Sequence, residues 1–225
     1  MTTAHGLIVD FGGVLTTSVG DAIRAFEQDE GLPQGTAFAV LGDGYSDTDA
    51  EHPIAGLETG RLAQLDFELA LAAKFAAHGH DVEAAGLVGR LLGSLTFDEA
   101  TWSVVTAARS AGVRTALLSN SWGDATAYPA DRLEETFDVV VISAEVGMRK
   151  PDAAIFELTA DRLDVAVERC AFVDDHDGNV RAAEVLGMFG VHHRDAVTTA
   201  GALSRFLAVD LTDAVDAAPS TPQDR

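Results

Sequence analysis

Short runs of apolar residues recur along this chain, and longer amphipathic stretches separate them. Each run is apolar at nearly every position rather than at alternate positions, which is typical of strands covered on both faces of a sheet. We therefore predict strands over residues 6–10, 115–119, 139–142, 171–174 and 189–192.

The stretches between the later strands have the periodicity of helices. We predict helices over residues 98–111, 153–163 and 179–186. In the first of these, Trp102, Val105 and Ala108 fall on one face, as the helical repeat requires. Strands that alternate with helices predict right-handed crossover connections, and so an α/β fold with a doubly wound parallel sheet.

A region near the N-terminus interrupts this alternation and contains no convincing strand. Its helical patterns cover residues 21–29, 60–77 and 82–92, and a loop rich in Gly, Pro and Asp covers residues 31–53. In the longest pattern, Leu62, Leu65, Leu69 and Ala73 fall on one helical face. We predict a core domain of residues 1–17 and 96–211, a helical cap domain of residues 18–95 and a disordered tail of residues 212–225.

Charge and composition exclude several classes of function. The chain carries 36 Asp and Glu against 15 Lys and Arg, for a net charge of −21, and this field repels nucleic acids and anionic membranes. Cys170 is the single cysteine, so neither an internal disulfide nor a CxxC metal site can form. We find no signal peptide and no apolar run of the roughly 18 residues that a membrane span needs. The expected location is the cytoplasm, and the expected state is a monomer or homodimer.

Polar side chains stand where the predicted strands end. Asp10 ends the first strand, Ser119 ends the second, and Asp174 and Asp175 end the fourth, while Lys150 follows the third. Because ligands of an open parallel sheet bind beyond the carboxyl ends of its strands, we expect these side chains to meet at one rim.

This combination of side chains predicts a reaction class. Clustered carboxylates repel one another, and a divalent cation relieves that repulsion. Oxygen ligands without histidine favour Mg²⁺ over zinc, and Lys150 and Ser119 can hold an anionic group beside the ion. A carboxylate nucleophile next to these groups is typical of phosphoryl transfer through an aspartyl phosphate, with a small phosphorylated molecule as substrate.

Four motifs in this order resemble those of the haloacid dehalogenase-like (HAD) hydrolase superfamily, in the branch with a helical cap inserted after the first strand. They are LIVDFGGVLT at residues 7–16, ALLSN at 116–120, VGMRKPD at 146–152 and FVDD at 172–175. The resemblance covers almost the whole chain apart from the tail. It implies a Rossmann-like core and a Mg²⁺-dependent phosphatase.

The resemblance also implies a role for each motif residue. Asp10 is expected to be the nucleophile, with Ser119 and Lys150 as catalytic partners. The phosphate-binding set is expected to be Gly12, Gly13, Ser119, Asn120 and Lys150. The expected metal ligands are Asp10, the Gly12 carbonyl, Asp174 and Asp175.

One motif position departs from the family. Most phosphatases of the family have a second Asp two residues after the nucleophile, which acts as general acid and base, and this chain has Gly12 there. Positioned acid–base catalysis contributes roughly 10²- to 10⁴-fold, so we expect slow turnover of alkyl phosphates and a smaller loss on acyl, aryl or anhydride substrates. Another side chain could replace the missing acid and base, and His176 is the best placed in the sequence because it directly follows Asp174 and Asp175. The other candidates are Thr16, Thr17, His52, His78, His80 and Asp177.

Three other functions stay open at this point. One is a hydrolytic 2-haloacid dehalogenase, although those enzymes need no metal and usually lack the double acid found at Asp174 and Asp175. Another is a phosphonatase-type carbon–phosphorus hydrolase, for which Lys74, the single lysine of the insert, would form a Schiff base. The third is a HAD-fold binding protein without catalytic activity.

Overall fold

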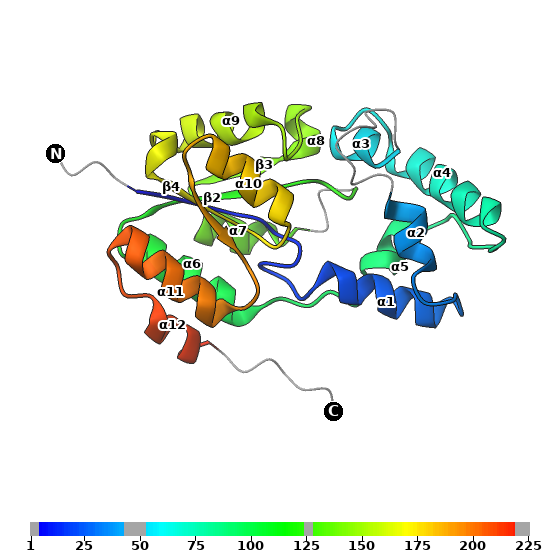
Figure 1. The fold of residues 1–225 in the computed structure, drawn as a ribbon, viewed down its shortest axis with the longest axis horizontal. Coiled ribbons are helices and arrows are strands. Elements are labelled where there is room, and N and C mark those ends of the chain that lie inside the picture. Colours follow the sequence, from blue (N-terminus) through cyan, green and yellow to red (C-terminus); the bar gives the residue numbers. More distant parts are fainter. Residues whose placement is uncertain (1–4, 43–52, 124–127, 219–225) are drawn as a thin grey trace.

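The computed structural model describes residues 5–42, 53–123 and 128–218. Its centre is a five-stranded sheet in the order β3-β2-β1-β4-β5, with every pair of neighbouring strands parallel (Figure 1). The strands are β1 (Gly6–Val9), β2 (Arg114–Ser119), β3 (Val139–Ile142), β4 (Cys170–Asp174) and β5 (Phe189–His192). The predicted fold class and all five predicted strands are confirmed, with ends within one residue of the prediction.

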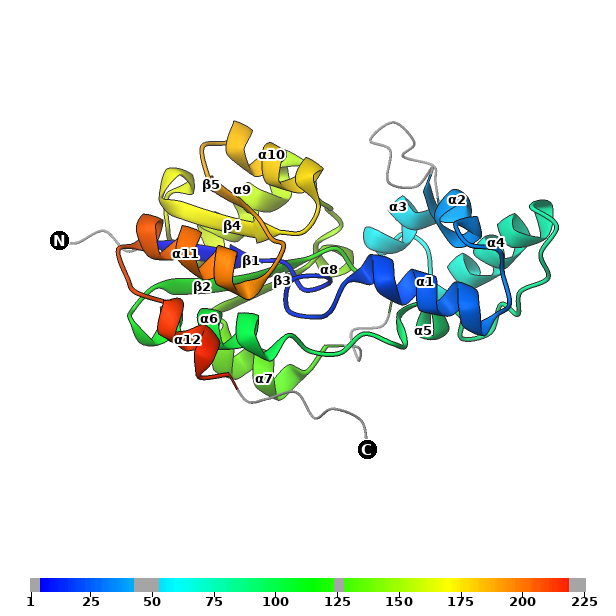
Figure 2. The same ribbon diagram turned by 60° about the horizontal axis from the view of Figure 1, so that its bottom comes forward.

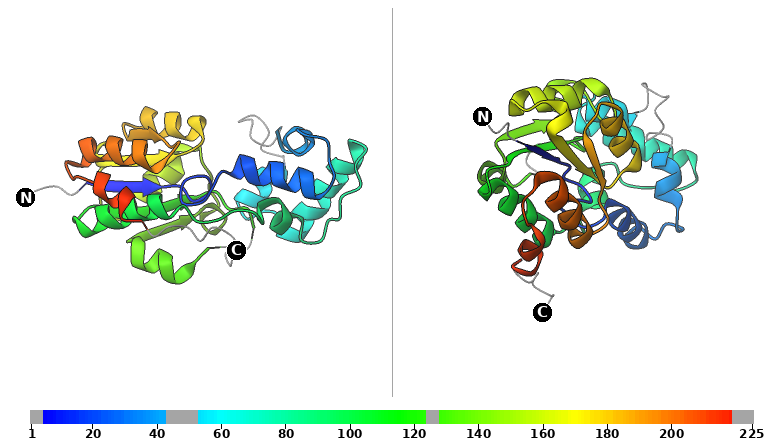
Figure 3. Two further views of the ribbon diagram at one scale, coloured as in Figure 1. Left: turned by 90° about the horizontal axis from the view of Figure 1, so that it is seen from below. Right: turned by 60° about the vertical axis from the view of Figure 1, so that its left-hand side comes forward.

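Helices cover both faces of the sheet, which explains why its strands are apolar throughout. On β1, Leu7 and Val9 face one apolar core and Ile8 faces the other, because side chains alternate along a strand. The helices on the face of Leu7 are α6 (Glu99–Ser110), α7 (Ala130–Thr136), α11 (Ala196–Leu207) and α12 (Thr212–Asp216). Those on the face of Ile8 are α9 (Ala153–Leu163) and α10 (Asp177–Val185) (Figure 3). The short α8 (Ser143–Val146) and a 3₁₀ turn (Val167–Arg169) complete this layer structure.

Five further helices lie together beyond the carboxyl ends of the strands, where Figure 2 shows them as a separate group. They are α1 (Val19–Asp29), α2 (Thr36–Gly42), α3 (Pro53–Glu58), α4 (Gln64–Ala77) and α5 (Leu87–Leu92). They share an apolar core of their own, which includes Phe26, Phe67 and Phe75. We call this group the cap. Within the described residues, no helix has the length and apolar character that crossing a membrane requires.

The two chain segments that enter and leave the cap run side by side. The Thr17 amide donates to the Thr96 carbonyl at 2.8 Å, and the Thr96 amide donates to Thr17 Oγ1 at 3.2 Å. Next to them, Thr16 and Phe97 form an isolated antiparallel bridge. The chain therefore enters and leaves the cap through one pair of neighbouring segments.

The structure corrects some predicted elements. The predicted loop over residues 31–53 contains α2, and residues 43–52 fall outside the described part of the chain together with His52. The α4 face that carries Leu65 and Leu69 is the exposed one, with 61% and 53% of those side chains accessible. The predicted disordered tail is also wrong at its start, because residues 212–216 form α12 and Leu211 before them is buried.

Candidate active site

Two acidic residues leave neighbouring strands at the centre of the sheet. Asp10 follows β1 and Asp174 ends β4, and the Asp10 amide donates to the Val173 carbonyl at 2.9 Å. The strand order reverses between β1 and β4, which is where an open sheet forms its ligand crevice. Asp10, Asp174 and Asp175 each place an oxygen within 4.8 Å of the other two. The predicted acidic cluster is thus brought together.

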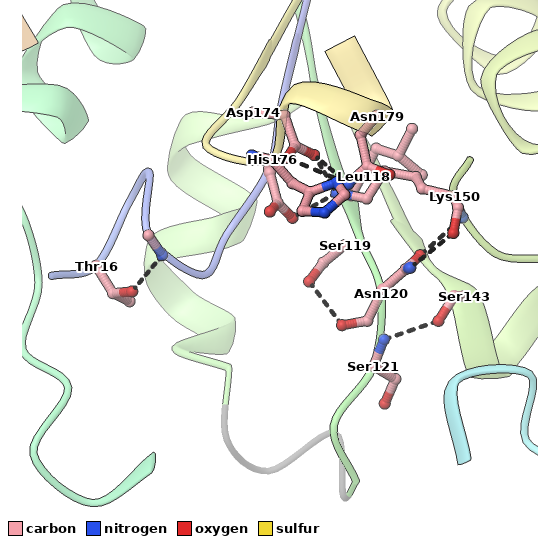
Figure 4. A network of polar contacts seen from close by, with 12 residues as sticks. Thr16, Leu118, Ser119, Asn120, Ser121, Ser143, Lys150, Asp174, His176 and Asn179 are labelled. Carbon is pink, nitrogen blue, oxygen red and sulfur yellow. Dashed lines mark hydrogen bonds and ion pairs between the residues drawn. The ribbon is translucent and has the colours of Figure 1, made fainter. Parts of the chain in front are cut away.

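Lys150 lies between two of these carboxylates. Its Nζ is 2.7 Å from Asp10 Oδ1. Figure 4 shows its other two partners, Asp174 Oδ2 at 2.7 Å and the Leu118 carbonyl, to which it donates at 3.1 Å. The side chain is 1% exposed, so three oxygen acceptors satisfy a fully buried ammonium group. A buried charge is tolerated only when it is paired in this way.

Burial and mutual contact shift the pKa values of the residues in this cluster. Burial raises the pKa of Asp10 to about 7; Lys150 opposes that rise, and Asp174 and Asp175 add to it. Burial and Asp174 raise the pKa of Asp175 to about 6, although this residue is exposed at the rim. Burial lowers the pKa of Lys150, but its two carboxylate partners outweigh burial and raise it above the usual range. Lys150 therefore stays charged.

Two further predicted residues, Ser119 and Asn120, lie at the end of β2 and directly after it. The Asn120 side chain donates to the Lys150 carbonyl at 3.0 Å and accepts from the Lys150 amide at 2.9 Å, so it fixes the loop that carries the lysine. Ser119 Oγ lies 3.0 Å from the Tyr128 hydroxyl. Burial raises the pKa of Tyr128 to about 12, so the phenol is neutral and can donate in this pair.

The loop after β1 approaches the acidic cluster closely. Gly13 has a φ of +74°, and a Cβ there would lie 2.1 Å from Asp175 Oδ2, so no other residue fits without moving that carboxylate. Around Gly12 there is more room, since a Cβ would meet only Val19 Cγ2 at 3.1 Å. The space that a carboxylate at position 12 would use is thus bordered by an apolar side chain of the cap.

The donor set fits Mg²⁺. Three carboxylates, backed by one buried lysine, carry an excess of negative charge at a position open to the pocket. Hard oxygen ligands of this kind suit Mg²⁺, which is bound in proteins by one or two carboxylates together with waters and substrate phosphates. The side chains that could hold it are those of Asp10, Asp174 and Asp175, and the Gly12 carbonyl stays a predicted ligand.

A pocket of about 860 Å³ opens above the cluster, between the sheet and the cap. Asp10, Ser119, Lys150 and His176 are among the residues that line it. Of the other side chains considered as a proton donor, Thr16 also lines it, but its hydroxyl accepts from the Gly13 amide and donates to the Thr17 carbonyl. His78 and Lys74 are not among the lining residues, so the pocket offers no support for a Schiff base at Lys74.

One charged pair in the pocket was missed by sequence reasoning. Glu58, at the end of α3, is 3% exposed, and its Oε2 lies 2.9 Å from Arg149 Nη1. Burial raises the pKa of Glu58 to about 7, against the opposing effects of Arg149, Lys150 and Asn120. The Glu58 carbonyl also accepts from Ser143 Oγ, whose oxygen accepts from the Ser121 amide at 2.7 Å. The sequence does contain one sign of this site, because Glu58 ends a short apolar run and directly precedes Thr59 and Gly60.

Comparison with known proteins assigns this combination of fold and rim chemistry to a hydrolase family. The chain belongs to the haloacid dehalogenase-like hydrolases, whose family pattern matches residues 5–187. Acyl-CoA dehydrogenase family member 10 of Mus musculus is 30% identical over 203 residues, which are 82% of this chain and 17% of that protein. Sesquiterpene phosphatase astK of Aspergillus oryzae is 40% identical over 65 residues, which are 29% of this chain and 33% of that protein. The chain thus spans only a fraction of either relative's length.

Solved structures share the fold at lower identity. A HAD family enzyme of Bacteroides thetaiotaomicron, crystallised with magnesium and inorganic phosphate, has a TM-score of 0.59 and 17% identity, covering 85% of this chain and 94% of that one. L-2-haloacid dehalogenase of Xanthobacter autotrophicus, with chloropropionic acid covalently bound, has a TM-score of 0.58 and 19% identity, covering 83% and 76%. The same fold thus holds magnesium and phosphate in one of these structures and covalently bound chloropropionic acid in the other.

Proposed function

We propose that this protein is a Mg²⁺-dependent phosphatase that acts on a small phosphorylated molecule through an aspartyl phosphate at Asp10. The observation that carries the proposal is the grouping of Asp10, Lys150 and the pair Asp174 and Asp175 at the polar end of one pocket. A dehalogenase has no need for the extra acidic pair, and a divalent cation would relieve the repulsion among the three carboxylates that Lys150 alone leaves in excess. The expected location in the cytoplasm is kept as part of this proposal.

The residues account for both halves of the reaction. A carboxylate oxygen of Asp10 attacks phosphorus, the bond from phosphorus to the ester oxygen breaks, and the electron pair leaves with that oxygen. Lys150 and the Ser119 hydroxyl neutralise and orient the phosphoryl oxygens. Water then attacks phosphorus, which releases inorganic phosphate and restores the Asp10 carboxylate. When bound, Mg²⁺ would supply charge neutralisation for the phosphoryl oxygens.

The departure at Gly12 limits the kind of ester that reacts well. No carboxylate stands there to protonate a leaving alkoxide, so an ester whose leaving group is a weak base reacts faster. Glu58 lines the same pocket, but its carboxylate is paired with Arg149. We expect aryl and acyl phosphates to be better substrates than alkyl phosphates.

The test is a panel of aryl, acyl and alkyl phosphates assayed with Mg²⁺ and with EDTA. We expect hydrolysis that requires Mg²⁺ and that is lost in Asp10→Asn. Release of chloride from a 2-haloacid without metal would replace the proposal with a dehalogenase. Absence of any turnover, together with tight binding of phosphate, would replace it with a binding protein.

A further inference from the structure

Most of the cap side of the pocket is built from apolar side chains on three helices, and Glu58 and Gln64 are its polar members. Each helix contributes a pair spaced three or four residues apart, so that both members lie on the same helical face. The pairs are Val19 and Ile23 on α1, Phe38 and Leu41 on α2, and Val88 and Leu92 on α5. The three helices therefore turn apolar strips toward the cavity that contains Asp10 at its other end.

This cavity is much larger than a phosphate group. A water molecule takes about 30 Å³ in the liquid, so a phosphate of five heavy atoms occupies only a small part of about 860 Å³. The remaining space must accept the rest of the substrate. Phe38 is 38% exposed, which leaves a large apolar side chain for a ligand to cover.

The two basic side chains of the pocket already have carboxylate partners. Among the described residues, Arg149 and Lys150 are the arginine and lysine that line it. Arg149 contacts Glu58, and Lys150 contacts Asp10 and Asp174. A second phosphate or a carboxylate on the substrate would therefore compete with buried ion pairs. Hydroxyl groups of a sugar would lose their hydrogen bonds to water against the apolar strips.

We infer that the substrates are phosphate esters whose other end is a long apolar group, lying along the strips of α1, α2 and α5. This inference rests on the proposed function and names its substrate class. Each buried methylene contributes about 0.8 kcal/mol of transfer free energy, which corresponds to a three- to fourfold gain in kcat/KM. An extended chain that fits the pocket should thus be preferred by orders of magnitude over a short one.

Gly89 controls how much room this group has. It lies on α5 between Val88 and Leu92, lines the pocket, and a Cβ on it would meet nothing within 4 Å. A leucine at this position would extend into open space without distorting the helix. Because glycine is the poorer helix former, the substitution should not weaken α5. Gly201 on α11 is a matched control, since it is also helical and without neighbours within 4 Å, and it is outside the pocket.

The experiment measures kcat/KM with Mg²⁺ for 4-alkylphenyl phosphates from methyl to octyl. All members share one type of phenol leaving group, so the missing carboxylate at Gly12 affects them equally. We expect kcat/KM to rise about threefold per methylene. In Gly89→Leu and in Phe38→Ser we expect kcat/KM for the octyl ester to fall about tenfold or more relative to kcat/KM for the methyl ester. Gly201→Leu should keep the wild-type slope.

The outcomes separate this inference from the proposed function. If the methyl ester is hydrolysed through Asp10 but the series is flat, the inference is wrong and the phosphatase stands. The inference is equally wrong if an ester whose octyl chain ends in a carboxylate reacts as well as the plain octyl ester. If no ester is hydrolysed, both are wrong. An unchanged slope in both Gly89→Leu and Phe38→Ser would remove the strips of α2 and α5 from the substrate site.

Discussion

At the scale of single residues, two adjacent glycines have opposite requirements. Gly13 has no space for a side chain because Asp175 occupies it, whereas Gly12 has only Val19 as a near neighbour. The sequence identified the absence of an acid at position 12, but it could not show what stands beside it. The group beside Gly12 comes from α1 of the cap, and its placement depends on how the cap docks.

Gly12→Asp tests whether a missing proton donor limits the reaction. The new side chain needs Val19 to move by a few tenths of an ångström. In the proposed reaction its carboxyl group would protonate the leaving oxygen. We expect kcat for alkyl phosphates to rise by about 10²-fold or more, with little change for aryl phosphates. Gly12→Asn is the control of equal size without an acid. An equal change in both substrate classes would show that proton transfer is not what Gly12 limits.

The raised pKa of Glu58 predicts that the stability of the fold depends on pH. That pKa is about 7 in the folded chain, against an unfolded value of 4.5, so the folded state binds this proton more tightly. The stabilising contribution of that proton is complete below pH 4.5 and is lost as the pH rises through 7. The free energy of unfolding of wild type relative to Glu58→Gln should therefore fall by roughly 2–3 kcal/mol between about pH 5 and pH 8, measured by urea denaturation. A difference that does not vary with pH would contradict the raised pKa.

At the scale of elements, apolar pattern predicts the sheet better than the cap. The strands are apolar on both sides because helices cover both, and this leaves one interpretation for each run. In α4, by contrast, apolar residues occur all round, and Phe67, Leu71 and Phe75 form the buried face in place of the one with Leu65 and Leu69. The helices α2 and α3 escaped prediction because each has fewer than eight residues and little room for a repeat.

Two buried glutamates organise the short helices of the cap. Glu27 accepts from the Gly35 and Ala37 amides near the start of α2, and Glu68 accepts from the Gly86 and Val88 amides at the start of α5. The first amides of a helix have no partner within it, so these carboxylates supply one. Through Val88, the Glu68 contacts fix a helix that forms one wall of the pocket.

Glu68→Ala should therefore destabilise the cap. Removing the side chain leaves two amides near α5 without their acceptor, and a buried polar group left in this state costs about 1–3 kcal/mol. Glu83→Ala is the control, because Glu83 accepts from the nearby Ala85 amide in an exposed position and should cost less than about 0.5 kcal/mol. Chemical denaturation of both variants measures the difference. Equal losses in the two variants would show that the Glu68 contacts carry no special weight.

At the scale of the whole molecule, the chain has a net charge of −21. Among the described residues, one group of three acids is close enough together to share a metal ion. Asp10, Asp174 and Asp175 converge where β1 and β4 meet the cap. The sequence predicted this convergence because parallel strands end at a common edge. It could not predict the apolar strips opposite, since these depend on how helices from three parts of the insert pack against one another.

The most direct test of the central claim is the covalent intermediate at Asp10. Wild-type protein is mixed with an aryl phosphate and Mg²⁺, quenched in acid within one turnover, and analysed by intact-mass and peptide mass spectrometry. The account predicts a mass gain of one phosphoryl group, located on the peptide that contains Asp10 and absent from Asp10→Asn. Turnover without phosphorylation of Asp10, or a phosphoryl group on another residue, would contradict it.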